Sequence, residues 1–174
     1  MSPDASTGRA RSASQLAATK TELELDLARL ERSDERAAPT VARGVCRLLH
    51  HMGYGALTEF GLSNGRRADV FALNNKGEVA IVEIKLSVAD FRGDGKWPQY
   101  LAYCDRFYFA VAEAFPHELI PQTTGLIVAD RFGGEIVREA PELRMATALR
   151  NREIRRFALF AANRLRRLRD PEVG

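Results

Sequence analysis

Residues 66–86 read RRADVFALNNKGEVAIVEIKL, and this stretch predicts two strands joined by a tight turn. Apolar residues dominate on both sides of the segment NNKG, which is typical of a β-hairpin turn. The second strand is almost continuously apolar from Val79 to Ile84, as in a strand that is covered on both faces. We therefore expect a hairpin inside a buried sheet.

Three charged residues interrupt this apolar hairpin, namely Asp69, Glu83 and Lys85. Residues i and i+2 of a strand share a face, so Glu83 and Lys85 project together and Ile84 projects to the other side. Burying such charges without partners is costly. A divalent cation would relieve the two acids, and the lysine could then face a bound anion. This combination indicates a metal-dependent phosphodiesterase, although a solvated Glu–Lys ion pair on an edge strand is the alternative.

The predicted metal ligands are oxygen atoms. Asp69 and Glu83, with the backbone carbonyl of Ile84, would hold Mg²⁺ or Mn²⁺, and waters would complete the octahedron. The cluster has no His or Cys, which favours a hard ion over zinc. Such an ion lowers the pKa of a bound water, and Lys85 would stabilise the charge that develops on the phosphate. Asp90 and Asp94 follow in the next loop and are candidates to support the site.

An acid on one strand and Glu-x-Lys on the next resemble the PD-(D/E)xK nuclease superfamily, with Ala68 where the superfamily name places a proline. A more specific resemblance extends over residues 43–164. Several blocks, in the right order, are similar to the bacterial MmcB family of DNA repair proteins linked to mitomycin C resistance: RGVCRLL, GRRAD, VEIK, ADFR, KW and YCD.

The resemblance implies a restriction-endonuclease-like α/β core around a central mixed sheet. The elements of this core follow the order helix, three strands, helix, strand. Superfamily members often add a further carboxylate, and Glu59 is the natural substitute here, with a surface glutamate as the alternative. Many also carry a glutamine on the helix after the motif, and Gln99 resembles it. The resemblance implies catalytic roles for Asp69, Glu83, Lys85 and Gln99.

Hydrophobic patterns give the expected elements. We expect a first helix over residues 40–52, which carries an apolar stripe, and a second helix over residues 97–104, with Pro98 in its first turn. Residues 91–96 should form a loop. A long helix runs from Leu143 onward with Ile154, Phe157, Ala158 and Ala161 facing inward. The predicted strands cover residues 55–62, 66–73, 79–86, 106–112, 125–129 and 135–138.

A chain of 174 residues is long enough for one domain with a substantial core. We expect a flexible arm over residues 1–35, with a short helix as an alternative for part of it. The nuclease-like core should cover residues 36–140, and a basic helix over residues 141–174 should pack on it. The chain has two cysteines, no C-x-x-C motif and no membrane-length apolar run, which predicts a cytoplasmic protein. The resemblance implies that it is bacterial and associated with the nucleoid.

The formal charge is only +3, but arginines accumulate late in the chain. Clustered arginines suit an anionic polymer, so we expect DNA as the partner, although a solvated helix face is the alternative. A homodimer is compatible with the sequence. The expected function is a metal-dependent DNA endonuclease in repair, and the alternative is a DNA-binding or scaffold protein on a nuclease fold. The expected DNA contacts are Arg66, Arg67, Lys96, Arg164, Arg166 and Arg167.

Overall fold

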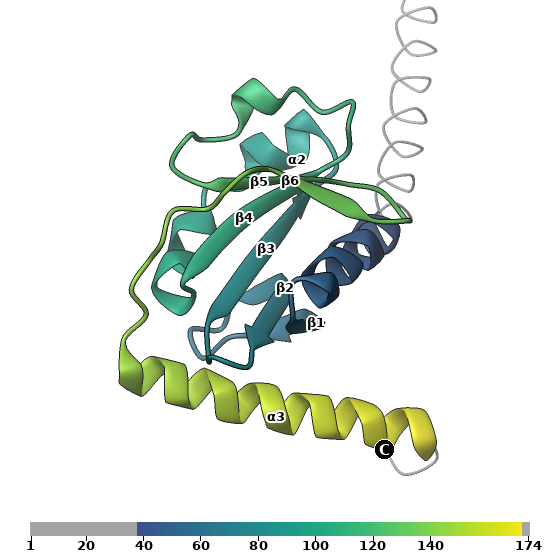
Figure 1. The fold of residues 1–174 in the computed structure, drawn as a ribbon, viewed down its shortest axis with the longest axis vertical. Coiled ribbons are helices and arrows are strands. Elements are labelled where there is room, and N and C mark those ends of the chain that lie inside the picture. The colour runs from purple at the N-terminus through teal and green to yellow at the C-terminus, as the bar shows by residue number, and fades with distance from the viewer. Residues whose placement is uncertain (1–37, 172–174) are drawn as a thin grey trace, which may run out of the picture. The chain divides into compact units, whose positions relative to one another are not determined.

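The structure is a computed structural model that describes residues 38–171, so the predicted arm over residues 1–35 lies outside the described residues. Its centre is a six-stranded mixed sheet whose strands lie in the order of the sequence (Figure 1). The first three strands are antiparallel, the next two continue parallel to the third, and the last is antiparallel again. The strands are β1 Tyr54–Gly61, β2 Arg67–Asn74, β3 Val79–Lys85, β4 Arg106–Val111, β5 Gly125–Ala129 and β6 Gly134–Arg138.

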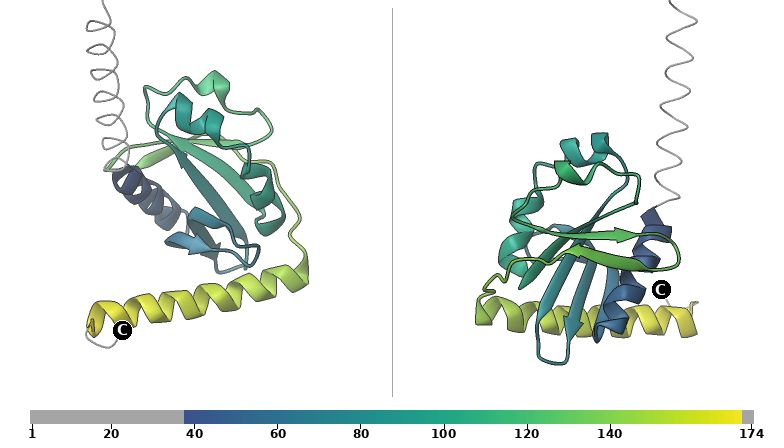
Figure 2. Two further views of the ribbon diagram at one scale, coloured as in Figure 1. Left: turned by 180° about the vertical axis from the view of Figure 1, so that it is seen from behind. Right: turned by 45° about the horizontal axis from the view of Figure 1, so that its top comes forward.

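Each face of the sheet has its own apolar core. On one face the helix over residues 38–51 packs Val45 and Leu49 against side chains such as Val82. On the other face Tyr100 and Phe107 belong to a larger aromatic cluster. This second face is covered by two short helices in the crossover between β3 and β4, namely α2 (Val88–Gly93) and the 3-10 helix η1 (Trp97–Tyr103) (Figure 2).

This arrangement confirms the predicted α/β class, and the strand boundaries agree with the sequence to within about one residue. The segment predicted as a loop over residues 91–96 contains the end of α2, because Ser87 accepts a hydrogen bond from the Asp90 backbone N–H and starts a helix there. The helix predicted over residues 97–104 is a 3-10 helix. A further short 3-10 helix, η2, covers His117–Leu119.

The C-terminal helix α3 (Thr147–Arg169) begins four residues later than predicted. The preceding segment is held against the sheet in extended form, where the Leu143 backbone N–H donates to the Asp105 carbonyl at 2.7 Å. Local sequence patterns carry no signal for such a long-range bond. The predicted start at Leu143 was therefore wrong.

The first part of α3 packs on the sheet, with Phe157 half-buried against Phe60 and Phe71 at ring-centroid distances of 6.1 and 5.8 Å. Two arginines of the same helix reach the edge strand β1: Arg156 donates to the Gly61 carbonyl at 2.7 Å, and Arg164 donates to the Thr58 carbonyl at 3.0 Å. These side chains satisfy carbonyls at an edge that would otherwise be open to another strand.

The predicted inward face of α3 needs one correction. Ile154, Phe157 and Ala161 are half-buried, but Ala158 is exposed, and the one fully buried residue of the helix is Glu153. Its Oε1 accepts a hydrogen bond from the Ser63 backbone N–H at 3.3 Å. A carboxylate thus occupies the position where an apolar residue is expected.

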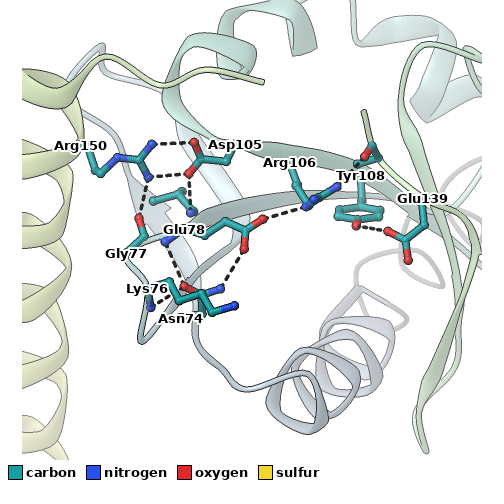
Figure 3. A network of polar contacts seen from close by, with 11 residues as sticks. Asn74, Lys76, Gly77, Glu78, Asp105, Arg106, Tyr108, Glu139 and Arg150 are labelled. Carbon is teal, nitrogen blue, oxygen red and sulfur yellow. Dashed lines mark hydrogen bonds and ion pairs between the residues drawn. The ribbon is translucent and has the colours of Figure 1, made fainter. Parts of the chain in front are cut away.

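A polar network fixes α3 to the end of the sheet where β4 begins (Figure 3). Arg150 forms a bidentate ion pair with Asp105, with both N···O distances at 2.6 Å, and it also donates to the Gly77 carbonyl. Asp105 accepts a further hydrogen bond from the Val79 backbone N–H at 2.8 Å. The Arg150 guanidinium beside Asp105 holds the pKa of that carboxyl below its usual range, although burial acts in the opposite direction.

Among the described residues, no helix is both long enough and apolar enough to cross a membrane. Cys46 and Cys104 are both free thiols. Burial raises the pKa of each, which makes the thiolate, the reactive form, less accessible.

Candidate functional site

The candidate site lies where β2 and β3 separate. Their backbone ladder ends at Val70 and Val82, and the next residues, Asp69 and Glu83, lie opposite each other on adjacent strands, as predicted. Side chains replace the ladder at this point: Glu83 Oε1 accepts from the Asp69 backbone N–H at 3.3 Å, and Asp69 Oδ2 accepts from the Ile84 backbone N–H at 2.7 Å. Residues opposite each other in a pair of strands share a face, so both carboxylates project to the same side.

These two acids share an environment that opposes ionisation. Glu83 is only 4% exposed, and burial together with the negative charge of Asp69 raises its pKa to about 8. Burial also raises the pKa of Asp69, and the Ile84 N–H and the nearby Lys85 offset this only in part. No arginine pairs with either carboxylate in the described residues. The pair therefore favours a bound proton or cation.

Lys85 is buried beside this pair, but its ammonium is held by a different acid. Its Nζ lies 2.6 Å from Asp94 Oδ2 and 3.9 Å from Asp90 Oδ1. Burial lowers the pKa of the lysine, but the hydrogen bond to Asp94 and the surrounding carboxylates outweigh this and raise it overall. Asp94 also accepts a hydrogen bond from the Lys96 backbone N–H, so it ties the lysine to the start of η1.

Glu59 is drawn away from the predicted metal site. Its Oε2 lies 2.7 Å from Nε of Arg67, and its side chain is 51% exposed. Its φ of 56° is unusual for a residue other than glycine, at a position that lies across from Asp69 in the strand pairing. Among residues 38–171, no three His, Cys, Asp or Glu side chains are grouped so that they could hold a metal. The structure therefore does not support Glu59 as a third ligand.

Gln99 lies in η1, and its side chain is paired with Arg66. Its Oε1 accepts a hydrogen bond from Arg66 Nε at 2.8 Å, and its backbone carbonyl accepts one from Asn64. The neighbouring Tyr100 is buried and donates its hydroxyl to the Arg67 carbonyl at 2.9 Å. Burial, followed by the charges of Glu83, Asp69 and Asp94, raises the pKa of Tyr100. The tyrosine hydroxyl thus stays protonated close to the acid pair.

The predicted DNA contacts lie in separate places. Lys96 and Arg67 are exposed, but Arg67 is already paired with Glu59. Arg164 is bonded to β1 and lies 5.8 Å from the Phe160 ring centroid, so part of its role is structural. The exposed residues Arg166 and Arg167 follow it on α3. From the sequence, all these residues were predicted alike to contact DNA. The sequence carries no signal for the ion pair and the hydrogen bond that Arg67 and Arg164 form within the protein.

Comparison with known proteins gives three findings. A solved structure, a protein of unknown function from Silicibacter pomeroyi, is 48% identical, has a TM-score of 0.75, and is matched over 77% of this chain and 92% of its own. A comparison with curated proteins finds no match. The sequence profile of the MmcB-like DNA repair proteins matches residues 26–172. This match covers most of the chain, and the chain therefore belongs to the MmcB-like family of DNA repair proteins.

Proposed function

We propose that the chain acts in DNA repair as an endonuclease that depends on a divalent metal. Family membership supports the role in repair. The observation that carries the nuclease activity is the opposed pair of the half-buried Asp69 and the buried Glu83, whose pKa values are raised where two strands separate. A buried lysine, Lys85, lies beside them. Clustered groups with perturbed pKa values are typical of reactive sites.

The residues present fit Mg²⁺ or Mn²⁺. Mg²⁺ keeps several waters and is commonly bound by one or two carboxylates together with substrate phosphates, so the pair does not require a third acid. The raised pKa of Glu83 gives the physical reason, because a cation would offset the cost of ionising it next to Asp69. The carbonyl of Ile84 is the further ligand expected from the sequence. The bound ion would supply a water of lowered pKa and would polarise the phosphate.

The remaining residues position these groups. Asp94 holds the Lys85 ammonium in place and keeps it charged, so that it can attract the phosphate as negative charge develops. Asp69 and Glu83 each use one oxygen for a backbone N–H, which fixes the direction of both carboxylates. Gln99 and Arg66 are hydrogen-bonded to each other and would contact the DNA backbone.

A second function has its own support. The acids already satisfy backbone N–H groups, and Lys85 already has a partner, so the cluster could serve stability alone. The chain would then be a DNA-binding or scaffold protein of repair with little or no cleavage.

The test is a cleavage assay on labelled nicked, branched, single-stranded and paired DNA with Mg²⁺ or Mn²⁺. The parent should cleave at least one substrate, and Asp69→Asn and Glu83→Gln should bind that substrate without cutting it. Glu118→Gln is the matched control, because Glu118 is an exposed acid outside the cluster. A parent that binds DNA and cuts none of these substrates with either metal would exclude the nuclease and favour the scaffold.

A further inference from the structure

The turn between β5 and β6 holds a large apolar side chain in solvent. Phe132 is 66% exposed at this turn. The turn itself is firmly built: Asp130 Oδ1 accepts from the backbone N–H groups of Phe132 and Gly133 at 2.7 and 3.0 Å, and the Asp130 N–H donates to the Gly133 carbonyl at 2.9 Å. The Phe132 backbone is therefore held in one conformation.

The helix over residues 38–51 braces the same turn. Arg47 Nη1 donates to the carbonyls of Arg131 and Phe132 at 3.2 and 3.0 Å. Gly44 lies so close to the carbonyls of Asp130 and Gly133 that any Cβ there would collide with them. Figures 1 and 2 show the tip of the β5–β6 hairpin beside this helix from each side. Single exposed apolar residues are common, but a braced one is unusual and indicates a contact surface.

Two arginines, Arg131 and Arg47, contact the exposed ring or the turn that carries it. The Arg131 guanidinium lies 4.5 Å from the Phe132 ring centroid. Arg43 and Arg47 are exposed and lie one helical turn apart, on the side of the helix that carries the bracing contact. An aromatic ring among cations is the combination that binds nucleic acid, since bases stack on the ring and phosphates pair with the cations.

The position of the turn relates it to the acid pair. The strands β3, β4 and β5 are parallel, and Lys85, Val111 and Val128 lie level across them. The turn that follows β5 therefore lies at the same end of the parallel strands as Glu83 and Lys85, two strands away. Glu83 projects to the face of Ile81, which packs in the core under η1, whereas the helix that braces the turn covers the other face.

We propose that Phe132 stacks on an unpaired base of DNA, while Arg131, Arg47 and Arg43 contact the backbone beside that base. This inference rests on DNA being the substrate of the proposed function and names its class, namely DNA with unpaired bases. On the other side of the turn, Glu113 and Glu135 line a hollow together with Asp130. Their charges repel phosphates and restrict the strand to the arginine side.

The test uses DNA binding in EDTA, where no cleavage occurs. A duplex with one extrahelical 2-aminopurine reports stacking through loss of fluorescence, and a fully paired duplex is the comparison. The parent and Phe132→Trp should quench the fluorescence. Phe132→Ala should lose this quenching and bind the bulged duplex about tenfold more weakly, with little change on paired DNA. Val137→Ala is the matched control, because Val137 is 54% exposed on the same hairpin.

Equal binding and quenching by Phe132→Ala and the parent would overturn the inference and leave the nuclease untouched. An equal loss on paired and bulged DNA would also overturn it. A loss of affinity in both Phe132→Ala and Val137→Ala, without any change in quenching, would overturn it as well, because the ring would then not stack on the base. If the parent binds none of these DNAs, the proposed function itself fails, and this outcome is distinct from the others.

Discussion

Asp105 and Glu83 are both buried acids of the central sheet, and the groups around them differ in kind. Asp105 lies where β4 begins and meets a guanidinium through two hydrogen bonds, with a further bond from a backbone N–H (Figure 3). Glu83 lies at the other end of β3, opposite a second acid, Asp69. The pKa of Asp105 is lowered, and that of Glu83 is raised to about 8.

The difference separates two uses of a buried carboxylate. At Asp105 the protein supplies the compensating charge itself, so the acid stabilises the fold and orients α3 through Arg150. At Asp69 and Glu83 the protein supplies backbone N–H groups but no arginine, so part of the cost of burial is not offset. Two carboxylates in such an environment favour a bound proton or a cation.

The largest expected effect on the free energy of unfolding is at Asp105, the acid that Arg150 compensates. Asp105→Ala should lower the free energy of unfolding by about 3 kcal/mol, because it leaves Arg150 unpaired and removes the acceptor for the Val79 N–H. Asp69→Asn should cost much less, since the amide oxygen can still accept from Ile84. Urea unfolding at pH 7 measures both. Equal losses in the two variants would remove the distinction between the two acids.

A divalent cation should stabilise the fold by binding only at Asp69 and Glu83, the acids that no arginine compensates. At a Mn²⁺ concentration of about 100 times its Kd, the free energy of unfolding should rise by about 2.7 kcal/mol. The double variant Asp69→Asn with Glu83→Gln should not respond, whereas a variant at the exposed acid Glu118 should respond like the parent. Thermal unfolding with and without the metal gives the measurement. An equal response in the double variant would place the ion elsewhere.

The pH dependence of stability should also differ between the two ends. The folded pKa of Glu83, about 8, lies above its usual 4.5, so its contribution is complete below about pH 4.5 and is lost as pH rises through about 8. The contribution of Asp105 to stability has the opposite pH dependence. It is present above about pH 3.8, the usual pKa of the group, and is lost as pH falls through the lower folded pKa.

Glu83→Gln should therefore match the parent near pH 4 and exceed its stability at pH 8, by about 1.4 kcal/mol for each unit of pKa shift that it removes. Urea unfolding at a series of pH values between 4 and 8 measures the difference. A constant difference between the two proteins at all these pH values would show that Glu83 keeps an ordinary pKa.

Much of this arrangement was predictable from local sequence. The NNKG turn between two apolar runs fixes the hairpin, and the hairpin alone places Asp69 next to Glu83. The short helix α2 could not be predicted in this way, because six residues are too few to show helical periodicity.

Contacts between distant segments were not predictable. The bond from Lys85 to Asp94 depends on how the crossover folds back, and acids in loops are too common to single one out. The ion pair between Glu59 and Arg67 likewise has no local signature, so sequence reasoning assigned the glutamate to the metal. Arg150 is one of the arginines that accumulate late in the chain, and nothing in the local sequence shows that it holds Asp105.

The arginines of α3 extend the comparison to positive charge, with the smallest expected effect on stability. Arg150 is paired with an acid and partly buried, whereas Arg167 and Arg169 are exposed near the end of a helix that has no acid between Glu153 and Asp170. Exposed arginines of this kind suit phosphates, although Asp170 directly follows Arg169.

Replacing Arg167 and Arg169 with alanine should change the free energy of unfolding by less than about 0.5 kcal/mol. If both contact phosphates, the slope of log affinity for DNA against log salt should fall by about 0.9 for each residue. Arg150→Ala is the matched control, because it should lower stability and leave that slope unchanged. Fluorescence anisotropy over a series of KCl concentrations gives the slopes. The same slope in the parent and the double variant would show that Arg167 and Arg169 do not contact DNA. This end of α3 would then be a solvated face or would contact a protein partner, and the DNA contacts would be confined to the ends of β2 and β3 that carry Asp69 and Glu83.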